Sequence, residues 1–161
     1  MRILEGTPGA GGQRFALVVS RYNDFVTRPL LEGALAALAE AHVAEDDITV
    51  AYVPGSFELP VAAQRLAETG RFAAVICLGC LIRGGTPHFE YIASAVSNAL
   101  ASASTATGVP IAFGVLTTNT VEEAIERAAP GTSNKGREAA LTAVEMSSLM
   151  RALETAIERL A

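Results

Sequence analysis

The chain has 161 residues, of which 50% are hydrophobic and 18% charged, and its formal net charge at pH 7 is −5. Its Lys and Arg residues are outnumbered and spread out, which argues against the clustered basic surface that binds nucleic acid. The length predicts a single domain, which we place at residues 14–161, and the glycine-rich start predicts a flexible N-terminal segment over residues 1–13.

No apolar stretch is long enough for a membrane span. The longest one, FAAVICLGCLI at residues 72–82, stops at Arg83 and Gly84, whereas a spanning helix needs about 18–20 apolar residues. The first 13 residues lack the apolar core of a signal peptide. We therefore expect a cytoplasmic protein that contacts no membrane. Because half of the residues are hydrophobic and only 18% are charged, we also expect a homo-oligomer whose subunit contacts cover apolar surface.

In the first half of the chain, strand and helix patterns alternate. Residues 14–20 predict a strand, and residues 30–41 repeat apolar side chains at helical spacing, with Thr27 as the expected N-cap and Pro29 in the first turn. A second strand is predicted at 48–53, and a second helix starts near Ser56 and closes at Gly70.

The second half continues this alternation. Residues 72–82 lack polar alternation, which predicts a strand covered on both faces. Thr86 is the expected N-cap of a helix over 88–108, with Pro87 at its first position. A strand at 110–118 and helices at 121–129 and 137–160 complete the pattern.

This regular alternation predicts a three-layer α/β/α sandwich, with a flavodoxin-like parallel sheet of about four strands and helices on both faces. Ligands bind such sheets at the carboxyl ends of the strands. Polar and aromatic residues follow all four predicted strands, at residues 22–24, 55–58, 83–88 and 117–120.

Residues 84–87, Gly-Gly-Thr-Pro, which we call the glycine turn, precede His88 and a helix. Free N–H groups at a helix N-terminus stabilise an anion, the glycines permit close approach, and the Thr86 hydroxyl adds a donor. Histidine is the side chain best suited to proton transfer near neutral pH, so His88 could transfer protons beside a phosphate ester. The alternative is a tight turn followed by a surface histidine.

The two cysteines, Cys77 and Cys80, form a C-x-x-C motif that could belong to a redox pair or half a zinc site. A redox pair favours a helix N-terminus, whereas these residues lie in a predicted strand and face opposite sides. We interpret them as two buried thiols and expect no metal.

Four further side chains could bind a ligand, three of them at strand ends and the fourth, Arg127, near the end of a predicted helix. The rings of Tyr22 and Phe57 could stack on a planar heterocycle, although a single ring is more often packing. Glu58 could bind hydroxyls or only match a helix dipole, and Arg127 could bind phosphate or be structural.

Taken together, six ordered blocks resemble the lumazine synthase family, from about Arg14 to Leu149. The blocks are SRYNDFVTRPLLEGAL, VPGSFELP, LGCLIRGGTPHFEYI, GVPIAFGVLTTNT, AIERA and NKGREAA. The resemblance implies the penultimate step of riboflavin biosynthesis. In that step 5-amino-6-(D-ribitylamino)uracil and 3,4-dihydroxy-2-butanone 4-phosphate condense to 6,7-dimethyl-8-ribityllumazine, phosphate and water, without a cofactor.

The resemblance also implies roles for particular residues. His88 is the expected catalytic residue, Gly85, Thr86 and Arg127 hold the phosphate, and Phe113 closes the pocket. In the family, the residues matching Phe113, Arg127 and Lys135 reach in from the neighbouring subunit. The residues expected to bind the pyrimidine and its ribityl chain are Tyr22, Asn23, Ser56, Phe57, Glu58, Lys135 and, through backbone groups, Cys80, Leu81 and Ile82.

The resemblance implies a pentamer, possible packing of pentamers into a sixty-subunit icosahedral shell, and riboflavin synthase as a possible partner. The family usually has Phe or Trp where this chain has Tyr22, which keeps an aromatic ring. Residues 129–136 read APGTSNKG, whereas shell-forming members typically carry a Gly-Thr-Lys-Ala-Gly-like turn. This connection influences whether pentamers assemble further.

Two other function classes compete with this enzyme. A flavodoxin-like electron carrier places a glycine- or hydroxyl-rich phosphate loop after the first strand, and SRYNDF contains no glycine there. A non-catalytic flavin-binding or shell-forming scaffold with the same fold stays open, although the presence of His88 and Arg127 favours the enzyme.

Overall fold

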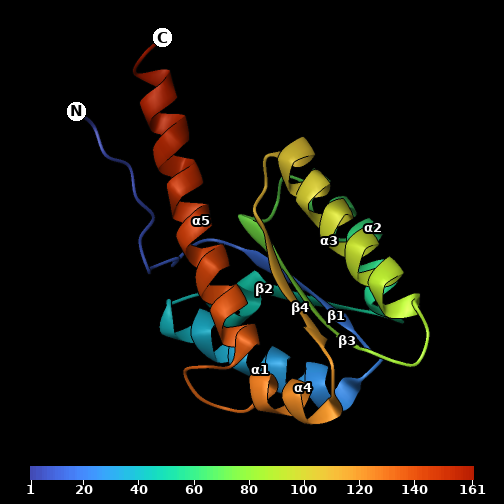
Figure 1. Cartoon of the computed structure of the whole chain (residues 1–161). Coiled ribbons are helices and arrows are strands. Elements are labelled where there is room, and N and C mark those ends of the chain that lie inside the picture. Colours follow the sequence, from blue (N-terminus) through green and yellow to red (C-terminus); the bar gives the residue numbers. More distant parts are fainter.

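The computed structural model describes residues 1–161, and strands and helices alternate along the chain (Figure 1). The strands are β1 (Phe15–Ser20), β2 (Ile48–Val53), β3 (Ala74–Ile82) and β4 (Ile111–Thr118). The α-helices are α1 (Asp24–Glu40), α2 (Leu59–Glu68), α3 (His88–Thr107), α4 (Val121–Ala128) and α5 (Lys135–Glu158). Two short 3-10 helices, η1 (Glu45–Asp47) and η2 (Ser56–Glu58), flank β2.

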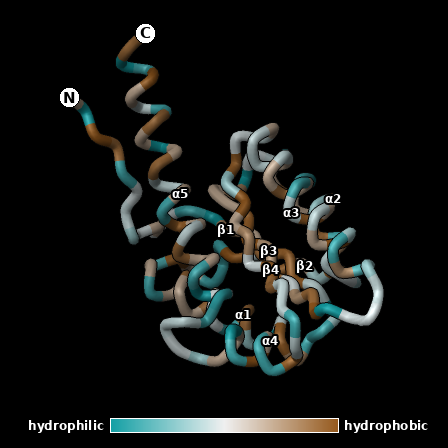
Figure 2. Tube along the Cα trace, in the orientation of Figure 1, coloured by the Kyte–Doolittle hydropathy of each residue, from teal (hydrophilic) through white to brown (hydrophobic).

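The four strands form one parallel sheet in the order β2-β1-β3-β4. Helices α1, α4 and α5 cover one face and α2 and α3 cover the other, so the three-layer α/β/α architecture is confirmed (Figure 1). Apolar colour concentrates on the strands between these two layers (Figure 2). The carboxyl ends of all four strands lie at one edge of the sheet, where ligands of such folds bind.

Strand β1 shows why the predicted strands lack polar alternation. Phe15, Leu17 and Val19 point into the core beneath α1 and α5, while Ala16 and Val18 point into the core beneath α2 and α3. All five are buried. Because each face is covered by helices, an apolar residue is favoured at every position, at roughly 1.5–3 kcal/mol for each large side chain.

Helix α1 begins earlier than the sequence predicts. Its first residue is Asp24, and Asn23 precedes it in the left-handed conformation at φ 61°. Thr27 is therefore not an N-cap, and that prediction is wrong. Its hydroxyl instead donates a 2.7 Å hydrogen bond to the carbonyl of Ser20, which ties α1 to the end of β1. Pro29 consequently lies inside the helix.

Helix α3 begins at His88, and the residue that precedes it in the N-cap position is Pro87. No side-chain hydrogen bond caps this helix, so the prediction that Thr86 is its N-cap is wrong. The pyrrolidine of Pro87 occupies the position where a capping side chain would stand. The Thr86 hydroxyl is therefore left available to another partner.

Helices α1 and α5 cross at very close range. A Cβ added to Gly136 in α5 would lie 1.9 Å from the carbonyl oxygen of Leu30 in α1. The buried side chain of Asn134 caps α5 by accepting from the amide of Arg137 at 2.9 Å, and it donates to the carbonyls of Pro29 and Ala128. Asn134 thus joins α1, α4 and α5 at one point.

Residues 1–14 run beside α5 to reach β1, and the C-terminal half of α5 extends past the sheet next to them (Figure 1). The amide of Thr7 donates to the Ser148 hydroxyl at 2.6 Å, and Ala10 is buried. The flexibility expected for residues 1–13 stays a prediction.

Candidate active site

A hollow of about 410 Å³ opens at the carboxyl ends of β1, β2 and β3, and we call it the β3 hollow. Its wall is formed by the loop after β1, by η2 after β2, and by the turn that joins β3 to α3. The lining residues are Tyr22, Asn23, Gly55, Ser56, Phe57, Glu58, Leu81, Ile82, Gly84, Thr86, His88, Phe89 and Ile92. Nine of the residues expected to have a catalytic or binding role are brought together here.

Two aromatic rings stand at the mouth of the β3 hollow. Tyr22 is 70% exposed and Phe57 is 63% exposed, which is unusual for rings of this size. The Asn23 amide donates a 2.9 Å hydrogen bond to the carbonyl of Cys80, so the loop after β1 is fastened to β3. The arrangement offers flat apolar surfaces to a planar ligand.

Ser56 is the one buried side chain whose polar atom has no hydrogen-bond partner. Its hydroxyl lies in the wall of the β3 hollow, 5% exposed, beside the space where a Cβ on Gly79 would stand. Leaving a buried hydroxyl unpaired costs roughly 1–3 kcal/mol, so a ligand that supplies a partner here is favoured.

The glycine turn and His88 form the side of the hollow at the N-terminus of α3. Gly84, Thr86 and His88 line it, and all residues from Gly84 to His88 are exposed. The 20-residue helix α3 directs its unpaired amides and the positive end of its dipole toward this turn. An anion could therefore be held next to the imidazole of His88.

Two further predicted residues lie beside the hollow without lining it. Gly85 is in the same exposed turn, and Cys80 contributes the carbonyl that Asn23 contacts.

Burial raises the pKa of the Cys77 thiol to about 12 and that of Cys80 to about 11. The two thiols lie in the cores on opposite faces of the sheet, as the spacing predicts, and at neutral pH they stay protonated.

Phe113, Arg127 and Lys135 lie elsewhere, in a second hollow of about 430 Å³ beside the edge strand β4. We call it the β4 hollow. Lys135 pairs with Glu138 at 2.9 Å, and Arg127 donates to the carbonyl of Glu123 at 3.2 Å. Within one chain, these cations do not reach the β3 hollow.

Several lining residues were not singled out from the sequence. Ile92 lies four residues after His88 and three after Phe89 in α3, spacings that place side chains on neighbouring parts of one helix face, and all three line the β3 hollow. This spacing is a signal that could have identified them. Glu138 and Thr142, one turn apart on α5, line the β4 hollow in the same way.

No helix in the structure has the length and apolar character of a membrane span.

Comparison with known proteins points to one family. A family model described as 6,7-dimethyl-8-ribityllumazine synthase matches residues 12–151. A relative from Syntrophus aciditrophicus (strain SB), named 6,7-dimethyl-8-ribityllumazine synthase, is 56% identical over 149 residues. The alignment covers 92% of this chain and 97% of the relative.

Proposed function

Because the chain belongs to the 6,7-dimethyl-8-ribityllumazine synthase family, we propose that the β3 hollow is its active site. The chain is a transferase that condenses 5-amino-6-(D-ribitylamino)uracil with 3,4-dihydroxy-2-butanone 4-phosphate to 6,7-dimethyl-8-ribityllumazine, phosphate and water. Both substrates are small molecules, and the reaction uses no cofactor.

The unpartnered hydroxyl of Ser56 is the observation that carries this assignment of the site. A ribityl chain offers several hydroxyls, each able to donate to or accept from the Ser56 oxygen. Glu58 stands next to it and can accept from the same chain. The rings of Tyr22 and Phe57 would hold the pyrimidine plane, and backbone groups of residues 80–82 would bind its edge.

The phosphate of the second substrate would lie against the glycine turn. Gly85 and Thr86 present backbone amides and a hydroxyl without a bonding partner, and the α3 dipole favours a negative charge there. The reactive ketone would then lie between the phosphate and the pyrimidine. Holding two reactants in this way can lower the barrier by up to about 7–11 kcal/mol.

His88 would move the protons of the reaction. An amine of the pyrimidine adds to the ketone, and water leaves to give an imine. Removal of a carbon-bound proton then expels phosphate with its bonding electrons and creates a new carbonyl, on which the second amine closes the ring with loss of water. A single imidazole beside the phosphate can accept and return these protons near neutral pH.

The β4 hollow would complete the site of a neighbouring subunit in a homo-oligomer. Its Phe113, Arg127 and Lys135 supply a ring and two cations, which the β3 hollow lacks for closing over a phosphorylated ligand. Exposed apolar side chains support such contacts, among them Phe25, Tyr52, Val61, Tyr91, Phe113 and Ile125. We propose a pentamer in the cytoplasm, with packing into a sixty-subunit shell and association with riboflavin synthase as further states that light scattering and co-purification would detect.

The purified protein, mixed with both substrates, is expected to release phosphate and form a fluorescent lumazine faster than the blank without protein. Each substrate omitted in turn is the control. Turnover equal to the blank, with binding of the pyrimidine retained, would favour the alternative of a non-catalytic scaffold.

A further inference from the structure

The glycine turn has few contacts of its own. No side-chain hydrogen bond involves any residue from 84 to 88, and a Cβ added to Gly84 or Gly85 would meet no atom within 4 Å. In the proposed function, however, both the phosphate and the imidazole of His88 depend on where this turn lies. Its position must therefore be set by a group outside it.

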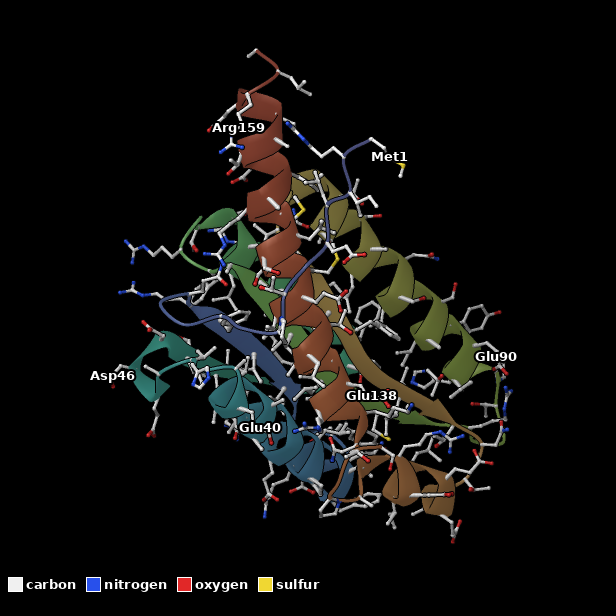
Figure 3. All side chains as sticks on the ribbon, turned by 90° about the vertical axis from the view of Figure 1, so that its left-hand side faces the viewer. Met1, Glu40, Asp46, Glu90, Glu138 and Arg159 are labelled. Carbon is white, nitrogen blue, oxygen red and sulfur yellow. The ribbon has the colours of Figure 1, made fainter.

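Arg83 supplies such a group, because its side chain folds across the turn that follows it. The Arg83 guanidinium contacts the carboxylate of Glu90 in the first turn of α3, and its Cζ atom lies 4.6 Å from the ring centre of Phe89. Figure 3 shows Glu90 at the start of α3, at the outer edge of the molecule. The guanidinium thus joins the two ends of the turn.

The same guanidinium also reaches the connection between β4 and α4. Its Nε atom donates to the Asn119 side-chain oxygen at 2.9 Å, and the Arg83 amide donates to the carbonyl of Thr118 at 2.8 Å. The amide of Asn119 in turn donates to the carboxylate of Glu123, one turn before Arg127 on α4. Arg83 therefore attaches the glycine turn to the element that bears Arg127.

We propose that Arg83 is a positioning residue, whose guanidinium holds the glycine turn and His88 in the geometry that the phosphorylated substrate requires. This inference rests on the proposed function of the β3 hollow. A planar guanidinium is needed because it donates in two directions while stacking on a ring, whereas an ammonium is a single point charge.

A positioning residue should affect the kinetics, whereas a purely structural residue should affect stability. The contacts of Arg83 contribute little to the free energy of folding. The side chains of Arg83 and Glu90 are 47% and 50% exposed, and ion pairs in contact with solvent stabilise proteins weakly. Loss of the Arg83 side chain should therefore lower the unfolding midpoint by less than about 4 °C. The effect of the residue should appear in the kinetics.

The test compares Arg83→Ala and Arg83→Lys with Arg65→Ala, which removes an exposed arginine paired with Glu68 on α2, outside both hollows. Arg83→Ala is expected to lower kcat/KM for the butanone phosphate on the order of 10- to 100-fold, because a small misplacement of the turn is costly. The inhibition constant of inorganic phosphate should rise, while the affinity for the pyrimidine stays unchanged. Arg83→Lys should lie between Arg83→Ala and the unchanged protein, and Arg65→Ala should match the unchanged protein.

Variants of the partners separate positioning from direct phosphate binding by Arg83. Glu90→Gln and Asn119→Ala should each reproduce part of the Arg83→Ala defect, and the double variant with Arg83→Ala should be no worse than Arg83→Ala alone. Partner variants that leave the kinetics unchanged would overturn the proposal. So would Arg83→Ala with unchanged kinetics, or with equal losses for both substrates.

Amide hydrogen exchange provides a readout that does not need turnover. The peptide over residues 83–92 should exchange faster in Arg83→Ala and at an unchanged rate in Arg65→Ala. If the unchanged protein showed no turnover, the proposed function would fail, and the exchange rates would still decide whether Arg83 holds the turn. Equal exchange in all three proteins would refute the positioning role.

Discussion

Two side chains of the β3 hollow are expected to act in different ways, one on proton transfer and one on binding. His88 is exposed in the first turn of α3, where we propose that it exchanges protons with the bound ketone. Ser56 is buried and its hydroxyl has no hydrogen-bond partner, so a ligand that supplies a partner there would bind more tightly. Single substitutions at these positions should therefore change different kinetic constants.

His88→Ala should slow turnover by about 10²-fold without abolishing it, because general acid–base catalysis is lost while the positioning of both substrates remains. Steady-state kinetics at saturating substrate measures kcat directly. Pyrimidine affinity, followed by fluorescence, serves as the control. Complete loss of turnover with intact binding would assign His88 a larger chemical role.

Ser56→Ala should raise the KM for the ribitylaminouracil several-fold while leaving the KM for the butanone phosphate unchanged. The same variant should be no less stable than the original protein, since it removes a buried hydroxyl that costs roughly 1–3 kcal/mol when unpaired. Urea unfolding of the ligand-free protein checks the second point. A clear loss of stability would mean that the hydroxyl already has a partner.

Because its two thiols are buried, the protein should lose stability as the pH becomes alkaline. The folded-state pKa of Cys77 is about 12, above the value of 9.0 for a free thiol, so the unfolded chain loses its proton first as pH rises. The contribution of this thiol to stability is therefore fully present below pH 9 and is lost between pH 9 and 12. From pH 8 to pH 10, the free energy of unfolding should drop by about 1.4 kcal/mol more than in Cys77→Ala, measured by urea unfolding. Equal drops in both proteins would contradict the burial of this thiol.

At the scale of elements, the crossing of α1 and α5 depends on close backbone approach. An alanine at Gly136 would place its methyl group 1.9 Å from the Leu30 carbonyl oxygen, so the helices would have to move apart. Alanine normally favours a helix over glycine by about 1 kcal/mol, and here the clash should outweigh that gain. Gly136→Ala is expected to lower the free energy of unfolding by about 2–3 kcal/mol.

Gly9→Ala is the matched control for Gly136→Ala. A Cβ on Gly9 would meet no atom within 4 Å, so the substitution should change the free energy of unfolding by no more than about 0.5 kcal/mol. Circular dichroism during urea unfolding compares the two variants. Equal stabilities would show that α1 and α5 can separate at little cost.

At the scale of the whole molecule, the two hollows of one chain lie apart, so each site is expected to take residues from two subunits. Co-expression of His88→Ala and Arg127→Ala chains with different tags, followed by purification of mixed oligomers, tests this. About one site in four should then combine an intact His88 with an intact Arg127, and turnover should rise above that of either variant alone. Mixed oligomers no more active than the variants would place each site within one chain.

Sequence patterns predicted the positions of all four strands along the chain and their parallel pairing, because both faces of the sheet are covered and continuous apolar runs of strand length result. They also predicted that Tyr22, Phe57 and His88 would follow strands, and parallel strands bring their carboxyl ends to one edge. Helix starts at Thr27 and Thr86 were predicted wrongly. In the first case a hydroxyl bonded to a strand carbonyl instead of a helix amide, and in the second Pro87 occupied the capping position.

What the sequence by itself determined is therefore the layered fold, the family, and which strand ends carry reactive side chains, because periodicity, spacing and residue type encode them locally. Only the tertiary structure decided that Asn134 joins three helices, that Ser56 has no partner, and that Arg83 meets Glu90 and Asn119. These facts depend on which distant segments the packing brings within hydrogen-bonding range. The local sequence pattern does not specify the distances between segments that are far apart in the chain.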